Sequence, residues 1–133
     1  MDQNSNYIYT QSGVLPIYDG KIVIITSRKK KRWIIPKGIV EPNMTPRESA
    51  QQEAYEEAGL VGKIKKKQIG KYRVKKWDGI CTVEIYPMIV EKLLDDWEEK
   101  SFRKRKLVFP EDAASLIKNK DLKEIILNYF HSN

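Results

Sequence analysis

The chain has few of the residues on which much enzyme chemistry depends. Among its 133 residues there are one cysteine, Cys81, and one histidine, His131. A single cysteine cannot form an internal disulfide. One histidine and one cysteine do not supply a zinc site of Cys and His ligands, and His131 alone does not suggest a Ser-His-Asp triad. Any catalysis must therefore rest on carboxylates, lysines or a bound metal.

Long apolar runs are also missing from the sequence. The longest are only a few residues, such as Ile22–Ile25, whereas a transmembrane helix needs about 20 apolar residues. We therefore expect no membrane span. Residues Met1–Asn6 are polar and lack the basic and apolar regions of a secretory signal. Together with the single cysteine, this predicts a reduced, cytoplasmic location.

Positive charge is what the sequence has in surplus. There are 25 Lys plus Arg and 18 Asp plus Glu, for a net charge of +7. Such a charge predicts an anionic partner: a phosphorylated small molecule, a nucleic acid or an acidic membrane surface. The length suits one domain, because domains commonly have about 100–200 residues. Composition alone does not choose among the three partners.

Periodicity and turn residues predict strands and helices in alternation. We expect strands over residues 7–18, 21–26, 33–35, 62–76, 79–91 and 104–109, with turns at Asp19-Gly20 and near Asp78-Gly79. We expect helices over residues 46–58 and 110–117, and a last helix that Asp121 caps. This pattern predicts an α/β sandwich around a mixed sheet in a single domain.

The helix over residues 46–58 carries an acidic face. Thr45–Glu48 is a capping box at its start. Glu53, Glu56 and Glu57 follow at i, i+3 and i+4, within an arc of roughly 100°. Like charges at this spacing weaken a helix by about 0.2–0.5 kcal/mol per pair, and a divalent cation would offset that repulsion. The alternative is a solvated acidic face answered by nearby lysines.

This segment resembles the Nudix box, G-x5-E-x7-R-E-U-x-E-E-x-G-U, in which U is a bulky aliphatic residue. The positions that match at the right spacing are Gly38, Glu53, Glu56, Glu57, Gly59 and Leu60. Residues 33–38 also resemble the family's approach to the box. The resemblance covers about residues 7–130 and implies a Nudix-type α/β/α sandwich.

Two positions depart from the family pattern. Met44 stands where the pattern has Glu, and Gln52 stands where it has Arg. In the family these two residues are understood as an ion pair that braces the loop against the helix. Because both charges are replaced together, neither is left without its partner. The double change therefore favours an altered brace over a destroyed metal site.

The C-terminal half resembles one Nudix subgroup, the diadenosine polyphosphate and diphosphoinositol polyphosphate phosphohydrolases and their bacterial relatives. The segments concerned are Ile85–Pro87, Leu94–Glu98, Arg103–Arg105 and Glu111–Ala114, although Leu107-Val108 replaces the subgroup's usual aromatic pair. The resemblance implies a metal-dependent hydrolase that cleaves a phosphoanhydride bond in a nucleoside diphosphate-linked substrate. A dinucleoside polyphosphate or a diphosphoinositol polyphosphate is the substrate that it favours.

The resemblance also implies roles for individual residues, with Mg²⁺ or Mn²⁺ as the metal. Glu53 and Glu57 match metal ligands, Glu56 matches the base or a bridging ligand, and the Gly38 carbonyl adds a ligand. Catalysis is assigned to Glu56 and Glu53. The expected phosphate contacts, against the alternative of solvated loops, are Lys37, Arg103, Arg28 and Arg105. Candidates for a further carboxylate, against the alternative of surface residues, are Glu84 and Glu98.

Two other functions stay open. The missing charges at Met44 and Gln52 are compatible with a Nudix-like module that binds a nucleotide or RNA and has weakened chemistry. Direct nucleic-acid binding through the basic loops is less favoured, because no zinc finger or RNP-like pattern is present. The sequence leaves the oligomeric state open, a homodimer included.

Overall fold

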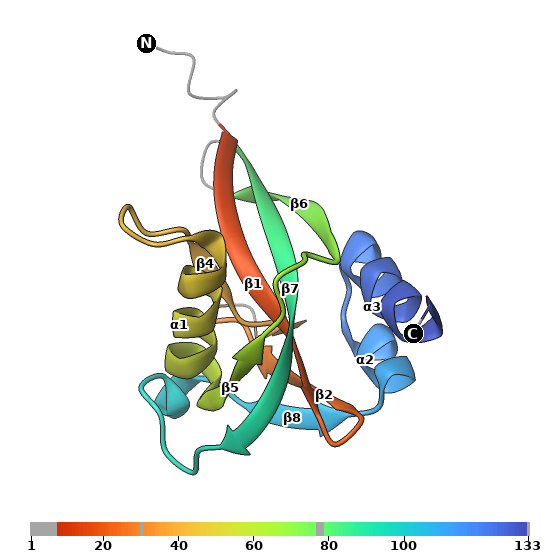
Figure 1. Ribbon diagram of the computed structural model, residues 1–133. Coiled ribbons are helices and arrows are strands. Elements are labelled where there is room, and N and C mark those ends of the chain that lie inside the picture. The colour runs from red at the N-terminus through yellow and green to blue at the C-terminus, as the bar shows by residue number, and fades with distance from the viewer. Residues whose placement is uncertain (1–7, 30, 77–78, 133) are drawn as a thin grey trace.

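The structure, a computed structural model, describes residues 8–29, 31–76 and 79–132. The strands are β1 (Ile8–Tyr18), β2 (Lys21–Thr26), β3 (Trp33–Ile34), β4 (Lys37–Ile39), β5 (Leu60–Ile64), β6 (Gly70–Lys76), β7 (Gly79–Leu93) and β8 (Arg105–Val108). The helices are α1 (Pro46–Ala58), the short η2 (Lys100–Phe102), α2 (Pro110–Leu116) and α3 (Lys120–Ser132). Helix α1 lies on one side of the sheet, and α2 and α3 lie on the other (Figure 1).

The sheet is mixed, and the two long strands β1 and β7 form its centre. They pair in parallel from Ile8 opposite Ile80 to Ile17 opposite Ile89. β2 and β4 pair antiparallel with β1, β5 and β6 pair antiparallel with β7, and β3 and β8 pair with β2. The backbone of β1 is therefore held along both of its edges.

A hydrophobic core lies on each face of the sheet. Alternate residues of a strand point to opposite faces, so Val14 belongs to the core beneath α1 and Leu15 to the core beneath α2 and α3. Ala50 and Ala54 of α1 are fully buried in the first core. Their small side chains let the helix lie close to β1. The predicted α/β/α sandwich is confirmed.

Several local predictions are also confirmed. Asp19 and Gly20 have φ angles of 51° and 77°, and they join β1 to β2 in a two-residue turn. Helix α1 has the predicted bounds and the predicted capping box, in which Thr45 and Glu48 each bond the backbone of the other. Gly59 ends the helix in the left-handed conformation, with φ 65°.

Three local predictions differ from the structure. The single strand expected over residues 62–76 is two strands, because the chain steps from Ile64, opposite Met88, to Gly70, opposite Ile85. The cap of α3 is Asn119, whose side chain accepts a hydrogen bond from the Leu122 N–H, rather than Asp121. Strand β4 was not expected. The predicted turn at Asp78 lies outside the described residues.

Two side chains from the β7–β8 region hold the C-terminal end of α1. Trp97 Nε1 donates to the Glu57 carbonyl at 2.9 Å, and Arg105 Nη1 donates to the Ala58 carbonyl at 2.9 Å. The Arg105 guanidinium also lies 4.2 Å from the centroid of the Trp97 ring. Because α1 has no basic residue in its last turn, Arg105 supplies the positive charge that a helix C-terminus favours.

Replacing Arg105 should therefore destabilise the fold. We expect Arg105→Met to lower the free energy of unfolding by about 1–3 kcal/mol, because the Ala58 carbonyl loses a charged donor. Urea denaturation measures this change. Lys104→Met is the matched control, since Lys104 is exposed and should change stability by less than about 0.5 kcal/mol. Equal stabilities for the two variants would contradict this role of Arg105.

Candidate active site

One open pocket, of about 740 Å³, brings together most of the residues singled out in the sequence. It is bounded by α1, the strands β1 and β4, and the loop over residues 27–32. Its charged lining consists of the acids Glu53, Glu56, Glu57 and Glu99 and the bases Arg28, Lys29, Arg32, Lys37 and Arg103. Acidic and basic side chains therefore face the same cavity.

Gly38 leaves the space that the Glu53 carboxyl group occupies. Gly38 is a buried residue of β4, where it pairs with Ser12 of β1. A Cβ atom added at this position would collide with the Glu53 carboxyl group. Glycine is thus the residue that lets the acidic side chain of α1 lie directly against the β4 backbone.

Glu57 ties α1 to two other segments. Its side chain is buried, and it accepts a hydrogen bond from the Lys37 backbone N–H at 3.1 Å. Its second oxygen faces the Arg103 guanidinium at 3.4 Å. Burial raises the pKa of the Glu57 carboxyl group, and the positive charges of Arg103 and Lys37 act in the opposite direction. Because Lys37 precedes Gly38, this contact also positions the glycine.

Glu53 has the most strongly perturbed acidity in the pocket. Burial raises the pKa of its carboxyl group to about 8, and the neighbouring carboxyl groups of Glu57, Glu56 and Glu99 add to the shift. The side chain therefore binds a proton at neutral pH in the metal-free protein. A divalent cation would relieve the same repulsion, and carboxylate oxygens suit Mg²⁺ or Mn²⁺.

The two residues that depart from the family pattern make contacts of another kind. Gln52 Nε2 donates to Glu56 Oε2 at 2.8 Å. Ser49 Oγ lies 3.7 Å from the Met44 sulfur and accepts a hydrogen bond from the Glu41 N–H at 3.0 Å. The loop before α1 is thus tied to the helix through Ser49, and Gln52 holds one oxygen of Glu56.

The chemistry of the pocket fits a divalent cation, although the carboxyl groups that could bind one do not converge on a single point. Across the described residues, no three His, Cys, Asp or Glu side chains lie close enough together to hold a metal ion. One oxygen of Glu56 is engaged by Gln52 and one of Glu57 by Arg103. The space at Gly38 and the raised pKa of Glu53 nevertheless fit a cation. The groups that could hold it are Glu53, Glu56, Glu57 and the Gly38 carbonyl.

Three of the four predicted phosphate contacts line this pocket, and Arg105 does not. Arg28 and Lys37 present exposed or partly exposed side chains. Arg103 is only 8% exposed and donates to the Thr26 carbonyl at 2.9 Å. The Arg105 guanidinium is committed to the end of α1, so we leave it out of the proposed site.

The structure also bears on the further carboxylate that was expected from outside the box. Neither Glu84 nor Glu98 lines the pocket, whereas Glu99 does. Glu99 accepts a hydrogen bond from Arg103 Nε at 2.7 Å. The spacing of four residues between Glu99 and Arg103 was the available signal in the sequence. Gln11 was also missed, because a glutamine within a strand belongs to no motif.

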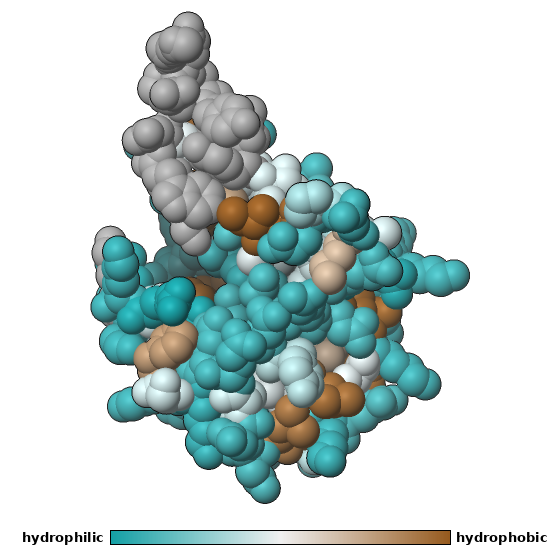
Figure 2. Space-filling view, turned by 90° about the vertical axis from the view of Figure 1, so that its left-hand side faces the viewer, coloured by the Kyte–Doolittle hydropathy of each residue, from teal (hydrophilic) through white to brown (hydrophobic). Residues whose placement is uncertain are grey.

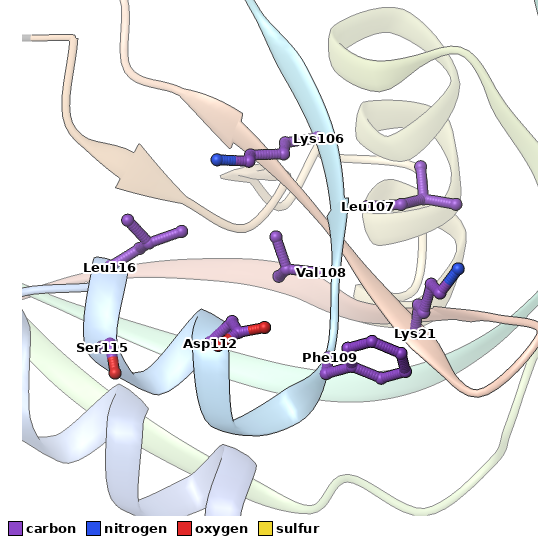
Figure 3. Close-up of a pocket in the computed structure, with 8 residues that line it drawn as sticks. All are labelled: Lys21, Lys106, Leu107, Val108, Phe109, Asp112, Ser115 and Leu116. Atoms are coloured by element: carbon purple, nitrogen blue, oxygen red, sulfur yellow. The ribbon is translucent and has the colours of Figure 1, made fainter.

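Two further cavities differ in their relation to this pocket. A cavity of about 420 Å³ shares Arg32, Ile34 and Lys37 with it and continues toward Trp33 and Tyr72. A separate pocket between β2, β8 and α2 contains none of the predicted site residues; it is lined by Lys21, Lys106, Leu107, Val108, Phe109, Asp112, Ser115 and Leu116 (Figure 3). The first of these cavities can extend the site, and the second lies apart from it.

The face turned to the viewer in Figure 2 is the side of the molecule on which α1 lies. That face is mainly hydrophilic, and its apolar areas are small and scattered. Single exposed apolar side chains, such as Tyr55, are ordinary on protein surfaces. None of the helices in the described part of the chain is long and apolar enough to cross a lipid bilayer.

The family follows from comparison with known proteins. A family model described as the NUDIX domain matches residues 10–128, which include the whole pocket. The chain belongs to the Nudix family. Enzymes of this family generally use divalent metal ions, which agrees with the carboxyl groups gathered on α1.

Curated relatives of this Nudix chain match it over part of their length. Human diphosphoinositol polyphosphate phosphohydrolase 3-alpha is 35% identical over 101 residues, which cover 74% of this chain and 60% of that protein. Nudix hydrolase 21, chloroplastic, from Arabidopsis thaliana is 31% identical over 109 residues, covering 80% of this chain and 54% of that protein. The chain thus spans 60% or less of the length of these relatives.

Solved structures confirm the Nudix fold. The crystal structure of a C. elegans Ap4A hydrolase superposes with a TM-score of 0.77 at 16% identity and covers 94% of this chain and 98% of that one. The E. coli ORF135 protein gives a TM-score of 0.75 at 15% identity, over 98% of this chain and 94% of that one. At these identities the likeness concerns the fold alone.

The space at Gly38 can be tested directly. We expect Gly38→Ala to weaken Mn²⁺ binding at least about tenfold, because the new Cβ displaces the Glu53 carboxyl group. Isothermal titration calorimetry measures the affinity. Gly20→Ala is the control: Gly20 has φ 77° and no neighbour within 4 Å, so stability falls while Mn²⁺ affinity is kept. Unchanged Mn²⁺ affinity in Gly38→Ala would show that the space between Gly38 and Glu53 has no role in metal binding.

The raised pKa of Glu53 predicts that the stability of the fold depends on pH. Folding raises its pKa from 4.5 to about 8, so its contribution to stability is full below about pH 4.5 and is lost as the pH rises toward about 8. Glu53→Gln stays neutral throughout. In EDTA, its free energy of unfolding should fall less between pH 5 and pH 8 than that of the wild type. Urea denaturation at both pH values tests this, and parallel pH profiles would refute it.

Proposed function

We propose that this Nudix chain is a metal-dependent pyrophosphohydrolase that cleaves a phosphoanhydride bond in a nucleoside diphosphate-linked substrate, most simply a dinucleoside polyphosphate or a diphosphoinositol polyphosphate. The observation that carries the proposal is the single pocket in which acidic side chains of α1 face the basic side chains of the 27–32 loop. The names of the human relatives and of the C. elegans structure support the choice of substrates.

Basic side chains answer the first physical difficulty of the reaction. A phosphoanhydride is surrounded by negative charge, which repels an attacking water until cations neutralise it. Lys37 and Arg28 would contact the phosphates, with Arg103 behind them. The Arg28 guanidinium lies 4.6 Å from the centroid of the Phe102 ring, and Lys31 Nζ donates to the Phe102 carbonyl at 2.9 Å. These contacts hold the basic loop against η2.

The acidic side chains would hold the metal and move the proton. Glu53, Glu57 and the Gly38 carbonyl bind the cation in this proposal, with Glu56 as a further ligand or as the base. A bound Mg²⁺ or Mn²⁺ supplies charge neutralisation and lowers the pKa of a coordinated water. Glu56 Oε2 is held by Gln52, so Glu56 Oε1 would be the atom that takes the proton from the attacking water where Glu56 acts as the base.

Substitution of the acidic residues tests the proposal. We expect Glu56→Gln and Glu53→Gln each to lower kcat/KM by about 10²–10⁴-fold, because each removes a proton acceptor or a metal ligand. EDTA should abolish turnover, and Mg²⁺ or Mn²⁺ should restore it. The assay quantifies products from a panel of dinucleoside polyphosphates and diphosphoinositol polyphosphates. Glu98→Gln is the control, since Glu98 is exposed and lies outside the pocket.

Other outcomes of the same experiment separate the alternatives. Full activity of both variants would show that Glu53 and Glu56 do not have the catalytic roles assigned to them. Calorimetric binding of diadenosine tetraphosphate with background turnover across the panel would favour a nucleotide-binding module instead, which the changes at Met44 and Gln52 make a specific alternative. Metal-independent RNA binding that falls steeply with salt would favour nucleic acid. The cytoplasmic location and the homodimer stay predictions.

A further inference from the structure

We propose that Gln11 binds the substrate: its side-chain amide donates hydrogen bonds to a phosphate oxygen next to the bond that is cleaved. The inference rests on the proposed function and adds a residue that lies outside the Nudix box. It starts from an unusual position, because a polar side chain at the centre of a sheet is rarely buried without a reason.

The backbone of Gln11 is held on both sides. Gln11 lies opposite Ile39 of β4 and opposite Val83 of β7. Its side chain is only 3% exposed, yet it lines the pocket that contains Glu53. The small exposed area of Gln11 therefore belongs to the pocket, and the residue has little freedom to turn elsewhere.

A hydrogen bond to Lys37 orients the amide group. Lys37 Nζ lies 3.3 Å from Gln11 Oε1. The oxygen and nitrogen of a side-chain amide are hard to tell apart by shape alone. An ammonium group has donors and no acceptor, so the amide atom that faces Lys37 must be the oxygen. The amide nitrogen of Gln11 consequently faces away from Lys37.

The amide nitrogen has no partner within the part of the chain that the structure describes. The bond to Lys37 involves the oxygen, and no other hydrogen bond of this side chain is present there. In the same residues, Ser12 Oγ is the one fully enclosed side-chain nitrogen or oxygen without a partner. The Gln11 nitrogen is therefore open to the pocket, where its two N–H groups can meet acceptors of a ligand.

The surroundings select an anionic acceptor. Arg28, Arg32 and Lys37 line the same pocket as Gln11, and their charges attract phosphate oxygens. Neighbouring residues of a strand point to opposite faces, so Gln11 and Lys37 lie on the other side of the sheet from the space between Gly38 and Glu53. Gln11 thus suits a phosphate beside the reacting one, because it lines the same pocket as Glu53 without occupying the space at Gly38.

Gln11→Glu separates binding from packing. The variant keeps the size of the side chain and an oxygen for Lys37, but it turns the free donors into an acceptor with negative charge. We expect KM to rise at least about tenfold for whichever substrate of the panel is turned over, with kcat changed less than about threefold. The affinity for methylenediphosphonate, a non-hydrolysable pyrophosphate analogue, should fall by a similar factor in calorimetry with Mg²⁺ present.

Thermal unfolding shows whether Gln11→Glu is folded at the assay temperature, since a new carboxylate at this buried position gains a partner in Lys37 but loses hydration. Gln68→Glu is the control: it makes the same charge change outside the pocket, and it should leave KM and methylenediphosphonate affinity unchanged. Gln11→Met is a second variant that removes the donors without adding charge, and it should also weaken methylenediphosphonate binding if it is folded.

The outcomes distinguish the inference from the function on which it rests. Wild-type affinity for methylenediphosphonate in both Gln11 variants would overturn the role of Gln11 while leaving the hydrolase proposal intact. A wild-type protein that binds methylenediphosphonate but hydrolyses nothing would contradict the proposed function, and the binding comparison would still decide the role of Gln11. A wild-type protein that neither binds nor hydrolyses would contradict both.

Discussion

Glu57 carries the buried carboxylate on which the arrangement of the pocket depends. From α1 it accepts a hydrogen bond from the Lys37 N–H of β4 and faces the Arg103 guanidinium at 3.4 Å. Removing one partner of a buried ion pair commonly costs about 3–5 kcal/mol, because the other charge is left uncompensated. Three segments that are distant in the sequence are therefore held together. Gly38 follows Lys37 directly, and Glu99 shares the same arginine.

The same contact explains how acidic and basic side chains occupy one cavity. Arg103 compensates the negative charges of Glu57 and Glu99, whereas no ion pair of Glu53 is found among the described residues. Burial and the neighbouring carboxyl groups raise the pKa of Glu53 to about 8. Positive charge faces the same cavity from the basic loop, through Arg28, Lys29 and Arg32. A net charge of +7 thus combines an acidic patch suited to a metal with a basic edge suited to phosphate.

Local patterns predicted α1 and its acidic face, because capping, helical spacing and the glycine stop all act within a few residues. The contacts that complete the site are long-range, and a single sequence does not contain them. In the sequence, Arg105 is one of several adjacent basic residues. Its contact with the end of α1 depends on the position of β8 in the fold. Glu98 and Glu99 are neighbouring acids that only the four-residue spacing to Arg103 distinguishes in the sequence, and the fold then brings Glu99 to that arginine. Gln11 becomes distinctive only because β4 brings Lys37 Nζ to 3.3 Å from its amide oxygen.

Met44 and Gln52 stand where the Nudix pattern has two opposite charges, and each makes a separate contact with a different side chain of α1. Ser49 and the capping box tie the loop to the helix by hydrogen bonds from backbone N–H groups, which need no charge at Met44. Gln52 is then free to contact its own helix, and it holds Glu56 Oε2 at 2.8 Å. The amide of Gln52 restrains this carboxyl group without placing a positive charge beside it, and it leaves Glu56 Oε1 for another partner.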